Sequence, residues 1–170
     1  MVVIAYIFTI INYICYCISR YCKSKSQMVS LDLLAKLSSI IALILLGSLT
    51  GGFNMTVSII LLIVIKIIEK KELSMRLNTI LFVLFCILYI LILVFTYNGL
   101  SSILSFITSM LILIGLWYLK PQGMRMIGIA ASLFCLSYMI SISNWAGLLE
   151  ILVLFSNISS YLYYRKGNKE

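Results

Sequence analysis

One carboxylate lies well inside an apolar stretch of this sequence. Glu150 is about one helical turn into the segment 146–164, and Asn157 follows seven residues later, so the two side chains share a helical face. Tyr161 and Tyr164 fall within about 40° of that face at 100° per residue. A carboxylate in such a segment usually faces a protein interior or water. The face therefore predicts a solute path or a proton relay; the structural alternative is that Glu150 bonds a Ser or Asn and fixes one helix contact.

A second polar face lies in the segment 101–119. Five hydroxyl side chains there fall within an arc of about 120°: Ser101, Ser102, Ser105, Thr108 and Ser109. In the segment 53–68, Asn54 and Ser58 share a face in the same way. Such side chains can hydrogen-bond a polar solute, and small polar residues also let membrane helices approach closely. Both interpretations stay open.

Two tryptophans and one arginine stand at the ends of apolar segments. Trp117 and Trp145 are expected to anchor opposite membrane interfaces, which is the usual place for tryptophan. Stacking against a sugar or a base is the alternative for Trp145. Arg125 is interpreted as a charge that sets topology, or as a partner for a phosphate or carboxylate.

Few side chains could support catalysis. The sequence has no histidine, five acidic residues, and no H-E-x-x-H, G-x-S-x-G or Walker motif. We therefore expect no enzyme, no catalytic residue, no metal site and no cofactor, and any transport would be passive or driven by a gradient. The five cysteines are interpreted as small apolar packing residues.

The amino-acid composition indicates that this chain is embedded in a membrane. Of 170 residues, 63 % are hydrophobic and 11 % charged, with one proline and a mean hydropathy of +1.15. Average globular proteins are about half apolar and about a quarter charged. This excludes a soluble globular domain, a disordered chain and, despite a net charge of +8, a module that binds nucleic acid. The expected partner is the lipid bilayer.

Charges and small polar clusters divide the chain into membrane-spanning segments. A helix needs about 20 apolar residues to cross a bilayer, and its backbone amides must be bonded within the segment. Seven spans are predicted: 2–19, 34–49, 53–68, 78–96, 101–119, 125–142 and 146–164. They use nearly the whole chain, so 1–170 is expected to form a single integral membrane domain of all-α class.

The basic residues predict an orientation. All 13 lie in, or within about a turn of, four segments: 20–33, 69–77, 120–124 and 165–170. The intervening turns 50–52, 97–100 and 143–145 have none. The positive-inside rule then places the N-terminus outside and the C-terminus in the cytoplasm. Lys36 and Lys66 are expected near the cytoplasmic edge, where their long stems can snorkel.

A weak internal repeat is visible. At an offset of 96 residues, Asn54 aligns with Glu150. Helix counting gives a triplet over 1–68, a linker helix over 78–96 and a triplet over 101–166. Because the linker crosses once, both triplets would run in the same sense. This 3+1+3 plan predicts parallel repeats with a site between them near the midplane.

Several motifs resemble a known family. They are Lys120-Pro121-Gln122-Gly123-Met124-Arg125, Asn144-Trp145-Ala146-Gly147, Glu150 and Asn157. At these positions the sequence resembles the YgjV-type family of small bacterial inner-membrane proteins, most clearly over 97–166. The resemblance implies a compact polytopic fold in the bacterial inner membrane.

The helix plan is also similar to that of the SWEET and PQ-loop transporters. Members of that group move sugars or amino acids between two triplets, and the resemblance implies Asn157 and Trp145 as counterparts of their Asn and Trp site residues. The sequence departs from the group in one respect. Its only proline, in Pro121-Gln122, lies at a helix end, so the hinge prolines of that group are absent.

The leading hypothesis is a transporter-like protein that moves a small polar solute between two helix triplets. Its expected contacts are Glu150, Asn157, Asn54, Ser105 and Thr108, with Trp145 near the outer mouth. The alternative is a non-transporting scaffold or accessory subunit of a larger membrane complex; a homo-oligomer also stays open. A buried, water-accessible Glu150 that faces Asn54 and the hydroxyls of 101–119 would favour transport. A Glu150 turned toward lipid headgroups would favour the scaffold.

Overall fold

The structure is a computed structural model that describes residues 2–45, 49–71, 74–141 and 145–167. Within these ranges the side chains of 2, 43, 49–51, 69–71, 145–146 and 166–167 lie outside the description. The described residues form seven α-helices and one short 3-10 helix: α1 (Val2–Arg20), α2 (Lys25–Leu45), α3 (Leu49–Lys71), α4 (Met75–Phe95), α5 (Leu100–Tyr118), α6 (Pro121–Ser141), η1 (Trp145–Leu149) and α7 (Glu150–Gly167).

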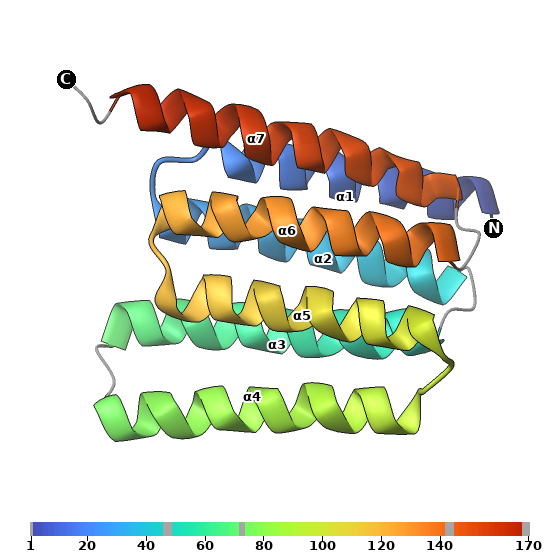
Figure 1. Cartoon of the computed structure of the whole chain (residues 1–170), viewed down its shortest axis with the longest axis horizontal. Coiled ribbons are helices and arrows are strands. Elements are labelled where there is room, and N and C mark those ends of the chain that lie inside the picture. The colour runs from blue at the N-terminus through green and yellow to red at the C-terminus, as the bar shows by residue number, and fades with distance from the viewer. Residues whose placement is uncertain (1, 46–48, 72–73, 142–144, 168–170) are drawn as a thin grey trace.

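The helices lie side by side in two layers (Figure 1). One layer contains α1, α2 and α3, and the other contains α7, α6 and α5 in matching order. The helix α1 packs against α7, and α3 packs against α5, while α4 lies at the edge against α3 and α5. The two chain ends lie at opposite ends of the bundle, as an odd number of crossings requires.

The two layers have an approximate twofold relation. Apart from α4, exchanging α1 with α5, α2 with α6 and α3 with α7 preserves the two-layer arrangement in Figure 1. Parallel repeats related by an axis along the membrane normal would produce this relation. The division into triplets 1–68 and 101–166 stays a prediction that this arrangement accommodates.

The start of α2 differs most from the prediction. The helix begins at Lys25, nine residues before the predicted span 34–49, so the predicted segment 20–33 is mostly helical. Ser24 accepts a hydrogen bond from the Gln27 backbone N–H at 3.3 Å, which is how a serine caps a helix N-terminus. The tight turn over 21–24 therefore takes the place of a long cytoplasmic loop.

Other helix ends differ by a few residues. The helix α3 begins at Leu49, so the predicted turn 50–52 is helical, and the preceding break lies outside the described residues. The helix α6 begins at Pro121, since proline lacks the N–H that a first helical residue leaves unbonded anyway. The 3-10 turn η1 precedes α7, where a continuous helix from 146 was predicted.

Length and composition fit a polytopic membrane protein. Within the described ranges, four helices are long and apolar enough to cross a membrane: Val3–Arg20, Met75–Phe95, Leu100–Tyr118 and Pro121–Ser141. Gly52–Ile68 is a shorter apolar helix. The helices α2 and α7 are not among these four. The helix α2 contains Lys25, Asp32 and Lys36, and α7 begins with a glutamate. The chain is all-helical over these ranges, as the sequence predicted.

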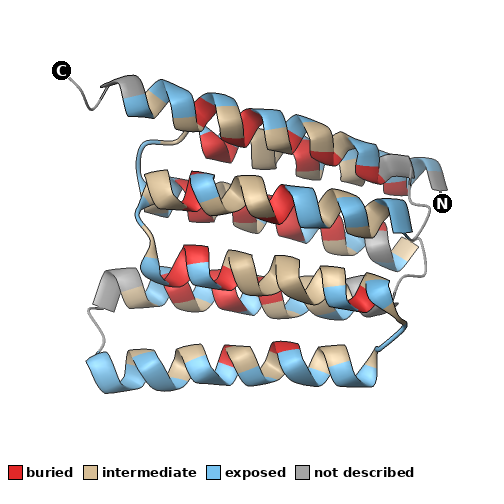
Figure 2. Ribbon diagram, in the orientation of Figure 1, coloured by how far each residue is buried: buried red, intermediate tan, exposed pale blue. Residues whose placement is uncertain are grey.

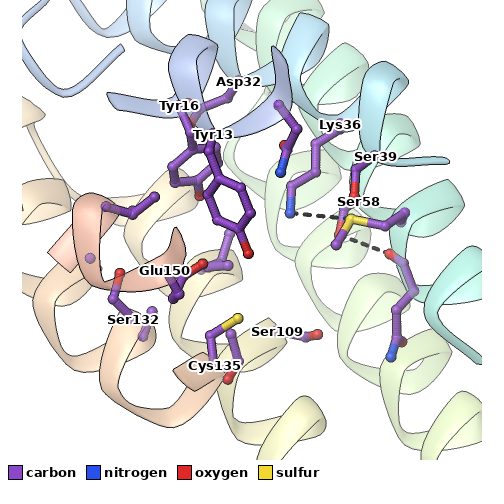
Figure 3. Close-up of a pocket in the computed structure, with 18 of the residues that line it drawn as sticks. Tyr13, Tyr16, Asp32, Lys36, Ser39, Ser58, Ser109, Ser132, Cys135 and Glu150 are labelled. Atoms are coloured by element: carbon purple, nitrogen blue, oxygen red, sulfur yellow. Dashed lines mark hydrogen bonds between the residues drawn. The ribbon is translucent and has the colours of Figure 1, made fainter. Parts of the chain in front are cut away.

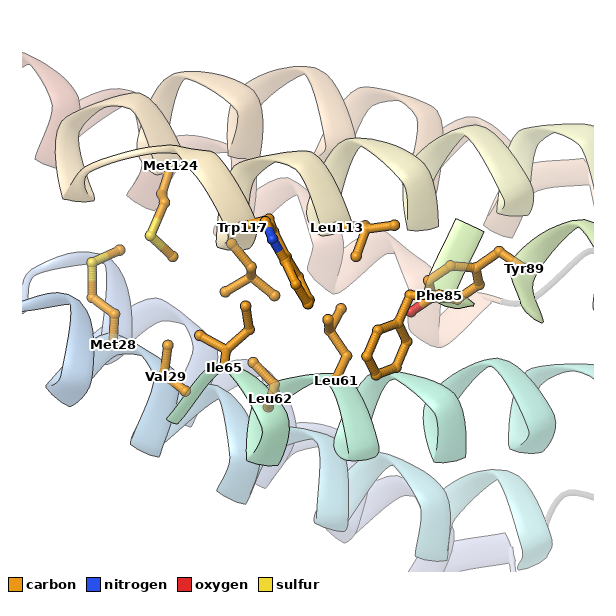
Figure 4. Close-up of a cluster of buried hydrophobic side chains, with 11 residues drawn as sticks. Met28, Val29, Leu61, Leu62, Ile65, Phe85, Tyr89, Leu113, Trp117 and Met124 are labelled. Atoms are coloured by element: carbon orange, nitrogen blue, oxygen red, sulfur yellow. The ribbon is translucent and has the colours of Figure 1, made fainter. Parts of the chain in front are cut away.

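The apolar faces divide into a lipid-facing surface and a core. The helix α4 buries Phe85 and Tyr89 and leaves most of its other side chains exposed (Figure 2). Phe85 lies 6.0 Å, centroid to centroid, from the Trp117 ring, in a cluster that joins α2, α3, α4, α5 and α6 (Figure 4). Trp117 is therefore a buried packing residue, and its predicted role as an interface anchor is wrong.

Candidate functional site: a charged cavity between the layers

A cavity of about 390 Å³ lies between the two layers. Its lining comes from α1, α2, α3, α5, α6, η1 and α7, with α2 and α6 facing each other across it (Figure 3). Pockets of a few hundred Å³ hold small molecules. Four charged side chains line it: Arg20, Asp32, Lys36 and Glu150.

Two of these charges neutralise each other. Arg20 donates from Nη2 to both carboxylate oxygens of Asp32, and Ser19 donates to Asp32 Oδ1 at 2.6 Å. The Arg20 guanidinium also lies 4.4 Å from the centre of the Tyr16 ring. The sequence indicated Glu150 as the one acidic residue inside the bundle. Asp32 is buried there as well. A buried pair with these hydrogen bonds is a structural element that joins α1 to α2.

Lys36 has no such partner. It lies at the middle of α2 and is 8 % exposed, with Nζ 3.4 Å from Met55 Sδ and 5.8 Å from the centre of the Tyr16 ring. Among the described side chains, no carboxylate forms an ion pair with it. The prediction that Lys36 snorkels to the cytoplasmic edge is wrong, because the early start of α2 places it mid-helix.

Glu150 enters the cavity from the other layer. It is the first residue of α7 and 9 % exposed. The hydroxyl groups of Tyr13 and Ser132 and the thiol of Cys135 surround its carboxyl group (Figure 3). The free N–H groups of a helix N-terminus also favour a carboxylate there. Glu150 is thus buried in a protein cavity rather than turned toward lipid headgroups.

The predicted polar residues of α3 and α5 meet at the same cavity. Asn54 donates from Nδ2 to Ser105 Oγ at 3.0 Å, and both residues line the cavity. Thr108 also lines it, with its hydroxyl bonded to the Leu104 carbonyl of its own helix at 2.9 Å. The structure brings these three candidate residues together with Glu150 in one cavity.

Two hydroxyls of the predicted face on α5 have another role. Ser101 donates to the Asn98 carbonyl at 3.0 Å, and Ser102 donates to the Thr96 carbonyl at 3.1 Å. They close the turn between α4 and α5. The helical face predicted from the sequence of α5 therefore includes both residues that line the cavity and residues that close the turn.

Asn157 lines the cavity at complete burial. Its Nδ2 lies 3.4 Å from Ser132 Oγ, whereas its Oδ1 has no hydrogen-bond partner among the described residues. Ser132 also faces Glu150, so the hydroxyl lies between the two predicted site residues. A buried carbonyl oxygen without a donor is an acceptor that a solute or a water molecule could satisfy.

Of the other predicted features, two tyrosines lie outside the cavity lining, and the place of Trp145 is untested. The backbone of Trp145 belongs to η1, but its side chain is outside the described residues, so its expected place near the outer mouth is untested. The Tyr161 carbonyl accepts a hydrogen bond from Gln122 Nε2 at 2.9 Å. The Tyr164 hydroxyl donates to the Tyr21 carbonyl at 2.6 Å. Neither tyrosine is among the residues that line the cavity, so the polar face predicted from Glu150 to Tyr164 does not line it continuously.

Arg125 closes the end of α1. It donates from Nε to the Arg20 carbonyl at 2.8 Å and from Nη2 to the Cys22 carbonyl at 2.7 Å. Its guanidinium lies 4.1 Å from the centre of the Tyr164 ring. It is 2 % exposed, and among the described residues no carboxylate forms an ion pair with it. Arg125 therefore satisfies carbonyls that a helix C-terminus leaves unbonded, a role that the sequence did not indicate. Its interpretation as a charge that sets topology stays a prediction.

The cysteines offer no metal site within the described ranges. No three His, Cys, Asp or Glu side chains cluster there, and all five thiols are free. Cys135 lines the cavity beside Glu150. Burial raises the pKa of the Cys22 thiol in the turn between α1 and α2, so this thiol stays protonated at neutral pH.

Comparison with known proteins identifies the family. A family model described as "Imp-YgjV: Bacterial inner membrane protein" matches residues 3–168, which extends well beyond the region 97–166 where the motifs are clearest. No curated protein and no solved structure matches the chain. The comparisons do not support the likeness to the SWEET and PQ-loop group. The chain belongs to the Imp-YgjV family of bacterial inner membrane proteins.

Proposed function

We propose that this protein moves a small polar solute across the bacterial inner membrane through the cavity between its two helix layers. The supporting observation is that a cavity of about 390 Å³ contains Lys36 and Glu150, each more than nine-tenths buried and neither ion-paired with the other. Ionisable groups inside membrane bundles generally face a water-filled cavity or a functional path.

The contrast with Arg20 and Asp32 supports this proposal. That pair shows how the chain neutralises charges that only hold helices together, through direct hydrogen bonds. A charge without such a partner is costly to bury. Lys36 and Glu150 are buried without such a partner among the described residues, so their burial is energetically costly. A scaffold that needs only helix contacts would not require two buried groups of this kind.

The arrangement of helices suggests how the cavity could open. The layers contact each other through α1 with α7 and through α3 with α5, while the cavity separates α2 from α6. The single proline stands at the first position of α6 and bends no helix interior. Rocking of one layer against the other at these two seams is therefore the motion we propose, in place of proline hinges. A gradient or simple diffusion would drive it.

The distribution of charge supports an orientation. The described basic side chains outside the cavity gather at the end of the bundle where the C-terminus lies: Lys23, Lys25, Lys66, Arg76, Lys120, Arg125 and Arg165. The turn between α4 and α5, at the other end, has no basic residue. By the positive-inside rule, the C-terminus is cytoplasmic and the N-terminus is outside.

Uptake of labelled small metabolites into proteoliposomes tests the proposal. Wild type should take up at least one polar metabolite above protein-free liposomes, and Glu150→Gln and Asn54→Ala should reduce that flux. Asn98→Ala is the matched control, because Asn98 is exposed in the turn between α4 and α5 and should leave uptake unchanged. If wild type moves no metabolite, the proposal fails and the accessory-subunit alternative takes its place.

A further inference from the structure

The cavity contains one unpaired group of each charge. Lys36 enters it from α2 and Glu150 from α7, in opposite layers of the bundle (Figure 3). Among the described residues, the only ion pair is the separate one between Arg20 and Asp32. The cavity therefore has a cationic wall and an acidic wall.

The cationic wall is suited to an anionic group. The Lys36 ammonium has three N–H donors, and among the described residues it contacts a thioether sulfur and the face of an aromatic ring. Both are weak substitutes for an anion. Asp32, the carboxylate nearest in sequence, is already occupied by Arg20 and Ser19. A carboxylate of a bound solute would supply the missing counter-ion.

The acidic wall is suited to a cationic group. The Glu150 carboxyl group is surrounded by Tyr13, Ser132 and Cys135, which are neutral polar side chains. Asn157 adds a buried carbonyl oxygen, Oδ1, that has no donor among the described residues. A solute ammonium has three N–H donors, and the carboxylate oxygens of Glu150 together with Asn157 Oδ1 are acceptors for them.

We infer that the transported solute is a small zwitterion, with its anionic group bound at Lys36 and its cationic group bound at Glu150. This inference rests on the proposed function and names the class of its substrate. A neutral solute would leave both buried charges without a counter-ion, and a solute of one charge would leave one of them without a counter-ion. Selectivity for a zwitterion follows, because an unpaired buried charge penalises the wrong ligand.

A matched set of ligands tests the inference on the purified full-length protein in lipid nanodiscs. Thermal unfolding is first measured with each of the twenty common amino acids, since a ligand that binds the native state raises the midpoint. The most stabilising one is then compared with its hydroxy acid, its amide and its hydroxy amide. These analogues lack the ammonium, the carboxylate, and both. The hydroxy acid and the amide should each bind at least about tenfold more weakly than the amino acid.

Two variants test which charged group of the solute binds at Lys36 and which binds at Glu150. In Lys36→Met the amino acid and its amide should bind alike, whereas in Glu150→Gln the amino acid and its hydroxy acid should bind alike. Lys36→Arg keeps the charge and should retain binding. Lys66→Met is the control, because the Lys66 ammonium bonds Ser30 outside the cavity at 2.9 Å. If a variant does not fold, the comparison of the four ligands on wild type decides alone.

Two results would overturn the inference. One is that no amino acid stabilises the protein, and the other is that the neutral hydroxy amide binds as tightly as the amino acid. Uptake separates this failure from that of the proposed function. Proteoliposomes that accumulate labelled glycerol or glucose but no amino acid would refute the zwitterion and keep the transporter. Proteoliposomes that accumulate none of these and no other labelled metabolite would refute both.

Discussion

Asn157 on α7 packs directly against Gly128 on α6. A Cβ atom at position 128 would lie 2.6 Å from Asn157 Oδ1, closer than real Cβ atoms approach. The absence of a side chain at Gly128 therefore lets Asn157 reach Ser132 and the cavity. The position of one candidate site residue thus depends on a glycine of the neighbouring helix.

The first prediction concerns this contact. Gly128→Ala should destabilise the protein by about 1–3 kcal/mol, because overpacking forces the neighbouring side chain or helix to shift. The measurement is the midpoint of thermal unfolding in detergent or nanodiscs. Gly52→Ala is the control, since a Cβ there meets nothing within 4 Å and should leave the protein as stable or slightly more so. An unchanged midpoint in Gly128→Ala would show that α6 and α7 are not this close.

The second prediction concerns Arg20 and Asp32. Asp32→Asn leaves a buried guanidinium without its counter-ion, so we expect a loss of about 3–5 kcal/mol. The double variant Arg20→Met with Asp32→Leu removes both charges and should be clearly more stable than Asp32→Asn. Equilibrium unfolding of the three proteins measures this difference. Equal stability of single and double variants would mean that the pair is not buried as described.

The third prediction concerns the end of α1. Arg125→Lys keeps the charge but cannot reproduce both bonds to the Arg20 and Cys22 carbonyls. Amide hydrogen exchange in the last turn of α1 should become faster, with a loss of stability of about 1–3 kcal/mol. Arg165→Lys, an exposed position, is the control. Exchange that is equally slow in both variants would exclude this capping role.

The fourth prediction concerns orientation. A green fluorescent protein fused after residue 170 should fluoresce in cells, and alkaline phosphatase at the same place should be inactive, because the C-terminus is expected in the cytoplasm. The opposite pattern would place the basic end of the bundle outside and contradict the positive-inside assignment.

Much of the helix plan could be predicted from hydropathy, and the main exception is the start of α2. The spans 78–96 and 101–119 nearly coincide with α4 and α5, because apolar residues and turn residues alternate clearly there. The start of α2 was missed because Lys25, Ser26, Gln27, Ser30 and Asp32 interrupt the apolar residues of its first two turns. The pattern Ser24…Gln27, serine followed three residues later by glutamine, is a capping-box signature that would have indicated it.

The candidate site was predicted in part. Glu150, Asn157 and Asn54 were found because each is polar in an apolar segment, and all three line the cavity. Lys36 was assigned to the aqueous edge, since its depth depends on where α2 begins. Tyr13 was missed for a different reason, because no local pattern shows that α1 packs against α7.

The most direct test of the transport account is to fill the cavity. Ser109 lines it from α5, whereas Ile114 on the same helix is partly exposed on the outer surface. Labelled-metabolite uptake into proteoliposomes is compared for Ser109→Phe and Ile114→Phe, with folding checked by thermal unfolding. The account predicts that a folded Ser109→Phe abolishes uptake and that Ile114→Phe retains it. Uptake at the wild-type rate by Ser109→Phe would contradict a solute path through this cavity.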